Sequence, residues 1–362
     1  MLPKESTMKI PALILILLSS LLLVSASPKR DLYQVMSSHP HDVKEFSPFI
    51  QTVTQKGRLW LVHADSGAPL QVMKHLRLTD GSDVKHYQVR EKKNKSSFKP
   101  WILQLGQHIQ AASIKSDVEM LSNFKTRMVG TPDNQRATLQ IKEIFSGMGL
   151  QTTQICYRDG ACSVIAEKAG DGSSEEVIML MAHLDSVGKN FAGADDNASG
   201  VAVMLEVARV LKNHPTKKTI RFFATNGEES GLLGAEHYAD ALKRSGAIKK
   251  LSLVINMDMV GYNANGIVEL ETDKQYEGLA QWFATLASNY TSLKSKITLG
   301  AWGSDHVPFI KRGVPTLLTI EDWSTKTPCY HLECDKPATL NYNYAAEIAK
   351  LNLAAIVTND AE

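Results

Sequence analysis

The chain has 362 residues, of which 43% are hydrophobic and 22% are charged, so it can bury a large core and form about two folding units. The formal net charge is only +2, and no stripe of Lys and Arg with interleaved aromatic residues is visible. Nucleic acid is therefore not an expected partner.

The N-terminal residues resemble a signal peptide. A basic start from Met8 leads into an apolar stretch at residues 12–24, and Val24-Ser25-Ala26 fits cleavage after Ala26. The alternative is an uncleaved membrane anchor, for which this stretch is short. We therefore expect residues 1–26 to be removed and the protein to be secreted, to the periplasm or the cell exterior, with no stable membrane association afterwards.

Residues 27–105 are predicted to form a pro-segment. They contain strand-like pieces at 58–63 and 85–89, but no catalytic constellation. The charged run at 90–95, followed by two serines, is typical of an exposed linker that proteases can reach. The peptidase domain is then expected over residues 106–362.

From residue 114 onward, helical and strand patterns follow one another. Two helices, at 114–124 and 132–147, precede the first strands. The later elements are expected as strands at 150–157, 162–167, 177–181, 219–224, 251–257, 266–271 and 315–320, and as helices at 201–212, 232–243, 276–287 and 345–358. This alternation predicts an α/β domain with a mainly parallel, mixed central sheet and helices on both faces.

The four cysteines form two local groups in the sequence. Cys156 and Cys162 are six residues apart, and Cys329 and Cys334 are five apart. The spacing favours one disulfide within each group, as an oxidising compartment would allow. Three connectivities are possible for four cysteines, and free thiols are the alternative to all of them.

The apolar run at 177–181 predicts a strand that is buried on both faces, and this run leads to His183. Asp185 follows two residues later, where its carboxylate could accept the other ring N–H of His183 and so orient a metal-bound imidazole. The loop GADDNASG at 193–200 then places Asp195 before a helix. The alternative is a polar connection in which Asn197 or Ser199 caps that helix.

Further acidic residues lie where other apolar strands end. The strand at 219–224 leads to Glu228 and Glu229, and the strand at 251–257 leads to Asp258. Singly, such residues are more often helix caps or charges that complement a helix dipole. The carboxyl ends of strands in an open α/β sheet are where ligands bind, however, and His331 adds a second imidazole. Together these residues predict a metal site at that edge.

This ligand set fits two zinc-like ions better than one, because a catalytic zinc typically holds three protein ligands and a water. The five predicted ligands are His183, Asp195, Glu229, Asp258 and His331. If Asp195 is shared, each ion receives one His and one further carboxylate, and the ions lie about 3.5–4 Å apart with a water between them. Glu228 is then free to act as a general base.

Six motifs, in this order, resemble those of the secreted bacterial leucyl aminopeptidases, which are co-catalytic two-zinc exopeptidases. The motifs are HLDS at His183, GADDNASG at Asp195, NGEESGLLGA at Glu228 and Glu229, NMDMVGY at Asp258, GSDHVPF at Ser304, and the final His331. The resemblance extends from about residue 114 to the C-terminus. It implies the zinc exopeptidase fold, two Zn²⁺ ions and peptide substrates with a free N-terminus.

The resemblance also implies a role for each site residue. It assigns His183 and Asp258 to one zinc ion, Glu229 and His331 to the other, and Asp195 as the ligand that bridges both. Glu228 becomes the general base that acts with the bridging water. Asp185, from its spacing to His183, completes the predicted catalytic residues. In this family the peptide after the bridging aspartate is commonly cis, which corresponds to residues 195–196 here.

The predicted function is removal of the N-terminal residue from peptides. A related zinc carboxypeptidase or dipeptidase shares the same metals and differs only in what binds the substrate terminus. A glutaminyl cyclase-like transferase has the fold but works with one zinc ion, whereas His183 and Asp258, the ligands of the second ion, are both present here. A catalytically inactive receptor domain on this fold is expected to lack ligands. The preferred N-terminal residue and the oligomeric state stay open.

Overall fold

The computed structural model describes residues 98–361, except residue 302, together with the backbone of four strands between residues 30 and 78. The chain divides into two compact units, the first formed by Met1–Gln55 and Leu59–Asp80 and the second by Lys56–Arg58 and Gly81–Glu362. The predicted signal peptide, the strand-like piece at 85–89 and the charged run at 90–95 lie outside the described residues. Among the helices that are described, none is both long and apolar enough to span a bilayer.

The first unit contains a four-stranded sheet in the order β2-β3-β1-β4. Its strands are β1 (Arg30–Met36), β2 (Ile50–Lys56), β3 (Leu59–Asp65) and β4 (Leu76–Leu78). Strand β1 pairs antiparallel with both β3 and β4. The strand predicted at 58–63 corresponds to β3.

The second unit is built on an eight-stranded sheet in the order β11-β10-β12-β9-β7-β8-β6-β5. Its strands are β5 (Gln151–Arg158), β6 (Ala161–Lys168), β7 (Val177–His183), β8 (Thr219–Thr225), β9 (Leu251–Met257), β10 (Ile267–Thr272), β11 (Lys294–Leu299) and β12 (Thr316–Glu321). The pairs β7–β8, β7–β9, β9–β12 and β10–β11 are parallel, and the pairs β5–β6, β6–β8 and β10–β12 are antiparallel. The predicted mixed sheet is confirmed.

Strand β7 is central because helices cover both of its faces. All seven of its residues are buried, and alternate side chains enter two different apolar clusters. Ile178 and Leu180 pack in the cluster that contains α7 (Gly200–Leu211), whereas Met179 and Met181 pack in the cluster that contains α8 (Leu233–Ser245). A strand of this kind needs apolar residues at every position, which is why its sequence does not alternate.

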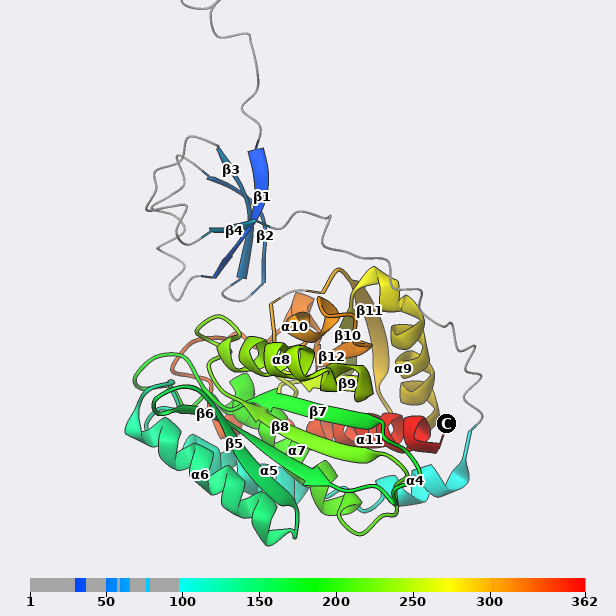
Figure 1. Cartoon of the computed structure of the whole chain (residues 1–362). Coiled ribbons are helices and arrows are strands. Elements are labelled where there is room, and N and C mark those ends of the chain that lie inside the picture. Colours follow the sequence, from blue (N-terminus) through cyan, green and yellow to red (C-terminus); the bar gives the residue numbers. More distant parts are fainter. Residues whose placement is uncertain are drawn as a thin grey trace, which may run out of the picture. The chain divides into compact units, whose positions relative to one another are not determined.

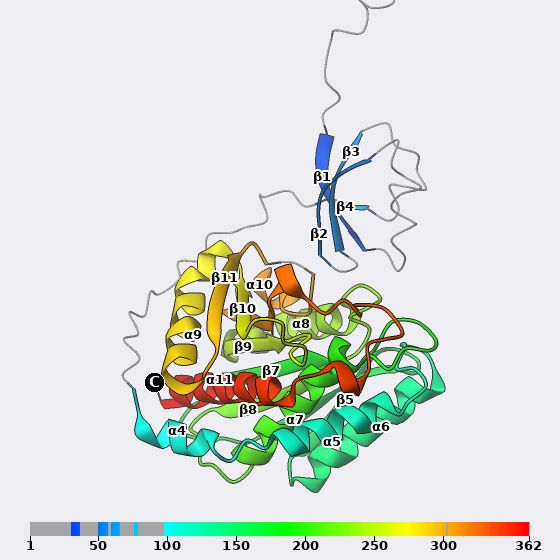
Figure 2. The same ribbon diagram turned by 180° about the vertical axis from the view of Figure 1, so that it is seen from behind.

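Helices cover both faces of the sheet (Figures 1 and 2). One apolar cluster joins the sheet to α5 (Ala111–Ser122), α6 (Pro132–Gly147), α7 (Gly200–Leu211), α9 (Glu277–Tyr290) and α11 (Tyr342–Ala361). The other cluster joins it to α8 (Leu233–Ser245) and α10 (Val307–Ile310). Helix α6 begins where its sequence predicts, since the Thr131 hydroxyl accepts the N–H of Asn134 and Pro132 occupies the first turn.

The strand β11 and the α-helices α10 and α4 (Pro100–Gly106) of the second unit were not predicted. Helix α4 falls within the predicted pro-segment, yet it packs on α9 and α11. Ile102 is buried, the main-chain N–H of Lys99 donates to the Tyr290 hydroxyl at 2.9 Å, and the ring of Phe98 stacks on that of Tyr290. The boundary predicted after residue 105 therefore falls within a helix that belongs to the second unit.

Both predicted disulfides are present. Cys156 on β5 is bonded to Cys162 on β6, and these two residues are also paired in the strand register. Cys329 is bonded to Cys334, so the segment that carries His331 is a closed loop. All four cysteines are therefore used in local cross-links, as their spacing favours.

Candidate metal centre

Two groups of three metal-ligating side chains lie beyond the carboxyl ends of the parallel strands. The first, here called the His183 triad, consists of His183, Asp196 and Asp258. The second, the His331 triad, consists of Asp196, Glu229 and His331. Within each triad the ligand atoms all lie within 4.8 Å of one another, and Asp196 belongs to both. This arrangement has the form of two adjoining cation sites with one shared carboxylate.

The two carboxylate oxygens of Asp196 point to different triads. Oδ1 lies 3.1 Å from Nε2 of His183, and Oδ2 lies 2.9 Å from Nε2 of His331. Each histidine also approaches a second carboxylate at 3.3 Å, Asp258 for His183 and Glu229 for His331. Four of the five residues predicted as ligands are thus brought together, with Asp196 as the fifth member.

Asp195, which was predicted as the shared ligand, is in neither triad. Its Oδ1 accepts the main-chain N–H groups of Gly261 and Tyr262 at 2.8 and 3.2 Å, so the carboxylate is turned toward the segment after β9. Because Asp195 holds that segment, the next residue supplies the carboxylate between the triads. The cis peptide bond lies at Asp196–Asn197, one residue later than the resemblance implies.

The loop between Gly193 and Gly200 anchors the segment that follows Asp258. Four successive main-chain N–H groups, at residues 259–262, are accepted by side chains of this loop: Met259 by Asn197, Val260 by Ser199, and Gly261 and Tyr262 by Asp195. The capping contact of the alternative interpretation is also present, because Asn197 Oδ1 accepts the N–H of Gly200 at the start of α7. One loop therefore caps α7 and anchors the chain beside a predicted ligand.

Asn197 fixes both neighbours of Asp258. Its Nδ2 donates to the carbonyl of Met257 at 2.8 Å, and its Oδ1 accepts the N–H of Met259 at 3.2 Å. Gly200 makes this approach possible, since a Cβ there would lie 2.4 Å from Asn197 Oδ1 and 2.7 Å from the Met257 carbonyl. The Asp258 side chain is held as well, because Oγ of Ser304 donates to its Oδ2 at 2.7 Å.

Asp185 contacts His183 differently from the prediction. Nδ1 of His183 lies 3.0 Å from the main-chain carbonyl of Asp185, whereas the Asp185 carboxylate is 3.7 Å away. That carboxylate accepts the main-chain N–H groups of Glu228 and Glu229, at 3.1 and 3.2 Å. It is turned toward the neighbouring loop because these two N–H groups are better placed donors than the imidazole. Asp185 therefore orients the loop that carries the two glutamates.

Glu228, the predicted base, is buried beside the triads and belongs to neither. Burial raises its pKa well above the ordinary value, and the negative charges of Glu229 and Asp258 add to the effect while His183 opposes it. A carboxylate that is close to a metal site but is not a ligand can exchange a proton with a reacting group.

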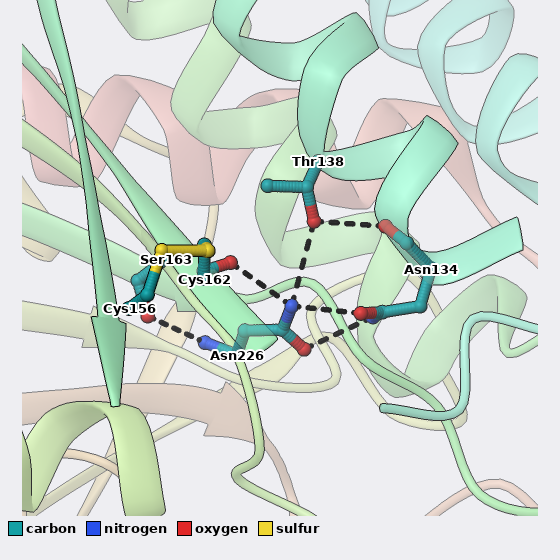
Figure 3. The surroundings of a disulfide bond; sticks show 6 residues. All are labelled: Asn134, Thr138, Cys156, Cys162, Ser163 and Asn226. Atoms are coloured by element: carbon teal, nitrogen blue, oxygen red, sulfur yellow. Dashed lines mark hydrogen bonds between the residues drawn. A yellow bond between two sulfur atoms is a disulfide. The ribbon is translucent and has the colours of Figure 1, made fainter. Parts of the chain in front are cut away.

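The loop that carries Glu228 is anchored from its other side by Asn226, whose surroundings Figure 3 shows. The Asn226 amide exchanges two hydrogen bonds with the amide of Asn134, at 2.9 and 3.0 Å, and donates to the carbonyl of Cys162 at 3.0 Å. Its main-chain N–H donates to Oγ of Ser163. The Cys156–Cys162 disulfide lies next to this contact, so β6 and α6 together hold the residues that precede Glu228.

The ionisable groups of the two triads shift one another's pKa values. Burial alone would lower the pKa of His331, but Glu229 and Asp196 outweigh it and raise the pKa to about 10. For His183, Asp258 and Glu228 likewise outweigh burial and raise the pKa. The pKa of Asp196 is lowered despite its burial, because it is hydrogen bonded to both histidines. Negative charge thus dominates this site, which favours cations.

Sequence reasoning missed three residues near the site. Arg127 is fully buried and donates to the carbonyls of Leu184 and Gly193, at 2.9 and 2.8 Å. Asp335 accepts main-chain N–H groups of the loop between Gly193 and Gly200, here called the metal loop. The pKa of Tyr330 is raised well above its ordinary value by burial and then by Asp196. The nearness of Tyr330 and Asp335 to His331 in the sequence was the available signal. Arg127 had none.

His306 follows Ser304 in a motif that borders the site, but it is in neither triad. It is fully buried, and its Nε2 lies 3.3 Å from Glu271, so it is part of the packing beneath the sheet edge.

Residues 163–356 match the sequence profile of peptidase family M28. The chain belongs to this family. The matched range contains both triads, Asp185 and Glu228, so the family assignment covers the whole candidate metal centre.

One relative is Aminopeptidase YwaD from Bacillus subtilis, which is 35% identical over 254 residues. The match covers 67% of this chain and 54% of YwaD, so the chain spans about half the length of this relative.

Solved structures share the fold. LapB from Legionella pneumophila has a TM-score of 0.70 at 22% identity, covering 92% of this chain and 100% of that one. BSAP, described as a zinc aminopeptidase from Bacillus subtilis, has a TM-score of 0.62 at 20% identity, with 69% and 95% covered. A glutaminyl cyclase from Porphyromonas gingivalis has a TM-score of 0.59 at 24% identity, with 70% and 99% covered. At these identities the likeness establishes the fold of this M28 chain.

Proposed function

We propose that this protein is a zinc-dependent aminopeptidase that removes the N-terminal residue from peptides. The observation that carries this proposal is the pair of triads that share Asp196, with the unliganded carboxylate of Glu228 beside them. The M28 family assignment and the relative named an aminopeptidase support the same reaction class.

The donor set fits zinc. Each triad offers one imidazole and two carboxylates, which is a common set for a catalytic zinc with a position left for water or substrate. Neither triad contains Cys, so neither resembles a closed structural site of thiolates. We propose one ion in each triad, with Asp196 as the shared ligand in place of Asp195. When bound, the ions would polarise the scissile carbonyl and lower the pKa of the attacking water.

Glu228 is proposed as the general base. As the water oxygen forms a bond to the carbonyl carbon, Glu228 takes a proton from that water, and it returns the proton to the leaving amine as the C–N bond breaks. A carboxylate suits this exchange, because a base must hold the proton briefly and then release it. The reaction consumes one amide and one water and yields a free amino acid and a shortened peptide.

Asp185 and the main chain of residues 228–229 are proposed to set the position of this base. The Asp185 carboxylate holds both glutamates by their N–H groups, so the catalytic Glu228 and the ligand Glu229 are oriented by one contact. A base must stay within hydrogen-bond reach of the water that it deprotonates, and this contact limits its movement.

The main alternative is a glutaminyl cyclase, a transferase that shares the fold. A single-ion enzyme would not need two complete triads, and the grouping of His183 and Asp258 with Asp196 supports the two-ion enzyme. A zinc carboxypeptidase or dipeptidase differs in how the substrate terminus is held.

We further propose that the protein is secreted and matures by loss of its N-terminal segment. Two disulfides are typical of an oxidising compartment, and the first residues fit a signal peptide. Because residues 98–106 pack on α9 and α11, cleavage before Phe98 would keep α4 and its contacts in the mature protein.

The deciding experiment compares a free aminoacyl chromogenic substrate with the same substrate blocked at its α-amine. An aminopeptidase hydrolyses only the free form, and metal analysis should give about two zinc ions per chain. Equal hydrolysis of the blocked substrate would exclude an aminopeptidase. Full activity with one ion, or cyclisation of an N-terminal glutamine peptide, would favour the cyclase.

A further inference from the structure

Asp335 joins the metal loop to the loop that carries His331. Its Oδ1 accepts the main-chain N–H of Asp195 at 2.8 Å, and its Oδ2 accepts that of Asp196 at 3.1 Å. The side chain is only 2% exposed. Asp335 directly follows the disulfide-closed loop from Cys329 to Cys334. The Asp335 carboxylate therefore binds the main chain at Asp196, and it does so from the side of the site that carries His331.

Arg127 holds the residues just before this point. Its guanidinium donates to the carbonyls of Ala192 and Gly193, at 2.5 and 2.8 Å, and its charge partly balances that of Asp335. Arg127 therefore binds the loop carbonyls at 192–193, and Asp335 binds the loop N–H groups at 195–196. Such contacts restrict where the Asp196 carboxylate can lie.

The His183 side of the loop is tied down separately. Asn197 bonds to both neighbours of Asp258, and Asp195 and Ser199 hold the three residues that follow. These bonds do not involve Asp335, so they remain when its carboxylate is removed. On the His331 side, in contrast, Asp335 accepts the main-chain N–H groups of Asp195 and Asp196.

We propose that Asp335 is a positioning residue for Asp196, and that the ion in the His331 triad depends on it more strongly than the ion in the His183 triad does. This inference rests on the proposed two-zinc function. Partners that orient ligands without touching the metal typically change metal affinity by about 10–100-fold.

The test measures stepwise zinc affinity in the full chain by competition with a chromogenic chelator, for the unaltered protein and for Asp335→Asn. The Asn amide has one neutral acceptor oxygen, whereas the Asp carboxylate has two charged ones. The amide therefore cannot replace both hydrogen bonds of the carboxylate. We expect one of the two affinities to fall by about 10–100-fold and the other to change by less than about threefold. Zinc-edge anomalous scattering from crystals with one equivalent of zinc then identifies the retained ion, which should lie in the His183 triad.

Asp360→Asn is a matched control. Asp360 also accepts two consecutive main-chain N–H groups, those of Lys218 and Lys217 at 2.8 and 3.2 Å, and it is 8% exposed. Lys218 precedes β8, at the opposite end of that strand from the loop to Glu228. This control should lower the unfolding temperature to a similar extent and leave both zinc affinities unchanged.

Three outcomes would overturn the inference: equal weakening of both sites, no weakening of either, or the same loss in Asp360→Asn. If Asp335→Asn does not fold, Asp335→Glu replaces it, because this variant keeps the charge and moves it by one CH₂ group, and the same outcomes apply. An unaltered protein that binds fewer than two zinc ions would refute the proposed function itself. That result is separate from the behaviour of the variants.

Discussion

The Asp185 carboxylate accepts the main-chain N–H of Glu228 at 3.1 Å, across 43 residues of sequence. The main-chain carbonyl of the same aspartate lies 3.0 Å from Nδ1 of His183. One residue therefore orients both a predicted ligand and the predicted base. This explains why the strand end at β7 and the loop after β8 form one site.

The first prediction concerns Glu228→Gln. The amide keeps the shape of the side chain but cannot take a proton, so kcat should fall by about 10²–10⁴-fold with little change in KM. Zinc content should stay at two ions, because Glu228 is in neither triad. Steady-state kinetics with metal analysis measure both. Near-normal turnover with two ions bound would rule out the base assignment and leave Glu228 a charge near a helix start.

Glu229→Gln is the matched comparison, since it makes the same chemical change one residue away. Glu229 lies 3.3 Å from Nε2 of His331 and belongs to the His331 triad. Its replacement should lower zinc content as well as turnover. If both variants kept two ions, Glu229 would not be a ligand.

The second prediction distinguishes the two adjacent aspartates. Asp196→Ala removes the carboxylate shared by both triads, so neither ion should be retained at about micromolar free zinc. Asp195→Ala removes the acceptor that anchors the main chain at 261–262, so the unfolding temperature should fall while zinc is still bound. Metal analysis and thermal unfolding of the two purified variants test this. Loss of both ions only in the Asp195 variant would restore Asp195 as the bridging ligand.

The sequence predicted the sheet, four of the five members of the triads and both disulfides, because those features depend on local pattern. The choice between Asp195 and Asp196 could not be predicted, since it depends on which carboxylate the distant N–H groups of Gly261 and Tyr262 occupy. The roles of Asp335 and Arg127 were hidden for the same reason: each acts through main-chain groups that are far away in sequence.

Two unpredicted elements have a different cause. Strand β11 is an edge strand in which exposed residues alternate with half-buried ones, so its sequence KSKITL lacks the apolar run of a central strand. Helix α4 is only seven residues long, and it follows a charged run that is typical of a linker. Its place in the fold depends on Tyr290 and α11, which the local sequence does not reveal.

The third prediction tests whether α4 is part of the peptidase unit. Ile102 is 2% exposed, so Ile102→Ala should lower the free energy of unfolding by about 2–5 kcal/mol. Leu103, the neighbour of Ile102, is 43% exposed, and Leu103→Ala should change the free energy of unfolding by less than about 0.5 kcal/mol. Urea unfolding of each variant measures the difference. Equal effects would mean that α4 is not docked in solution.

The same packing predicts where the N-terminal segment can be removed. A chain that starts at Phe98 should be active and as stable as the processed enzyme. A chain that starts at Ala111 loses buried Ile102 and the rings that stack on Tyr290 and His214, so it should be less stable. Cleavage before Phe98 should raise the activity of the secreted precursor. N-terminal sequencing of an active form that begins near Ser27 would refute an inhibitory pro-segment.

The last prediction is a pH dependence at the contact between Trp101 and His214, whose rings stack with centroids 5.8 Å apart. Burial lowers the pKa of His214 below its ordinary value of 6.5, and the positive charge of Lys168 lowers it further. In the unfolded chain His214 regains its ordinary pKa. At a pH between its folded and unfolded pKa values, His214 is therefore protonated more in the unfolded state than in the folded state. The free energy of unfolding must therefore fall as the pH drops through this window.

His214→Gln removes this titration and keeps a polar side chain of similar size. From about pH 7.5 to about pH 5 the free energy of unfolding should fall less steeply in the variant than in the unaltered protein, because the variant has no such proton to bind on unfolding. Urea unfolding of both proteins, with chelator present so that metal binding does not contribute, gives the two curves. The contributions of the other titrating groups to the free energy of unfolding largely cancel when one curve is subtracted from the other. Parallel curves across this range would show that His214 titrates alike in the folded and unfolded chains, and that α4 does not cover it.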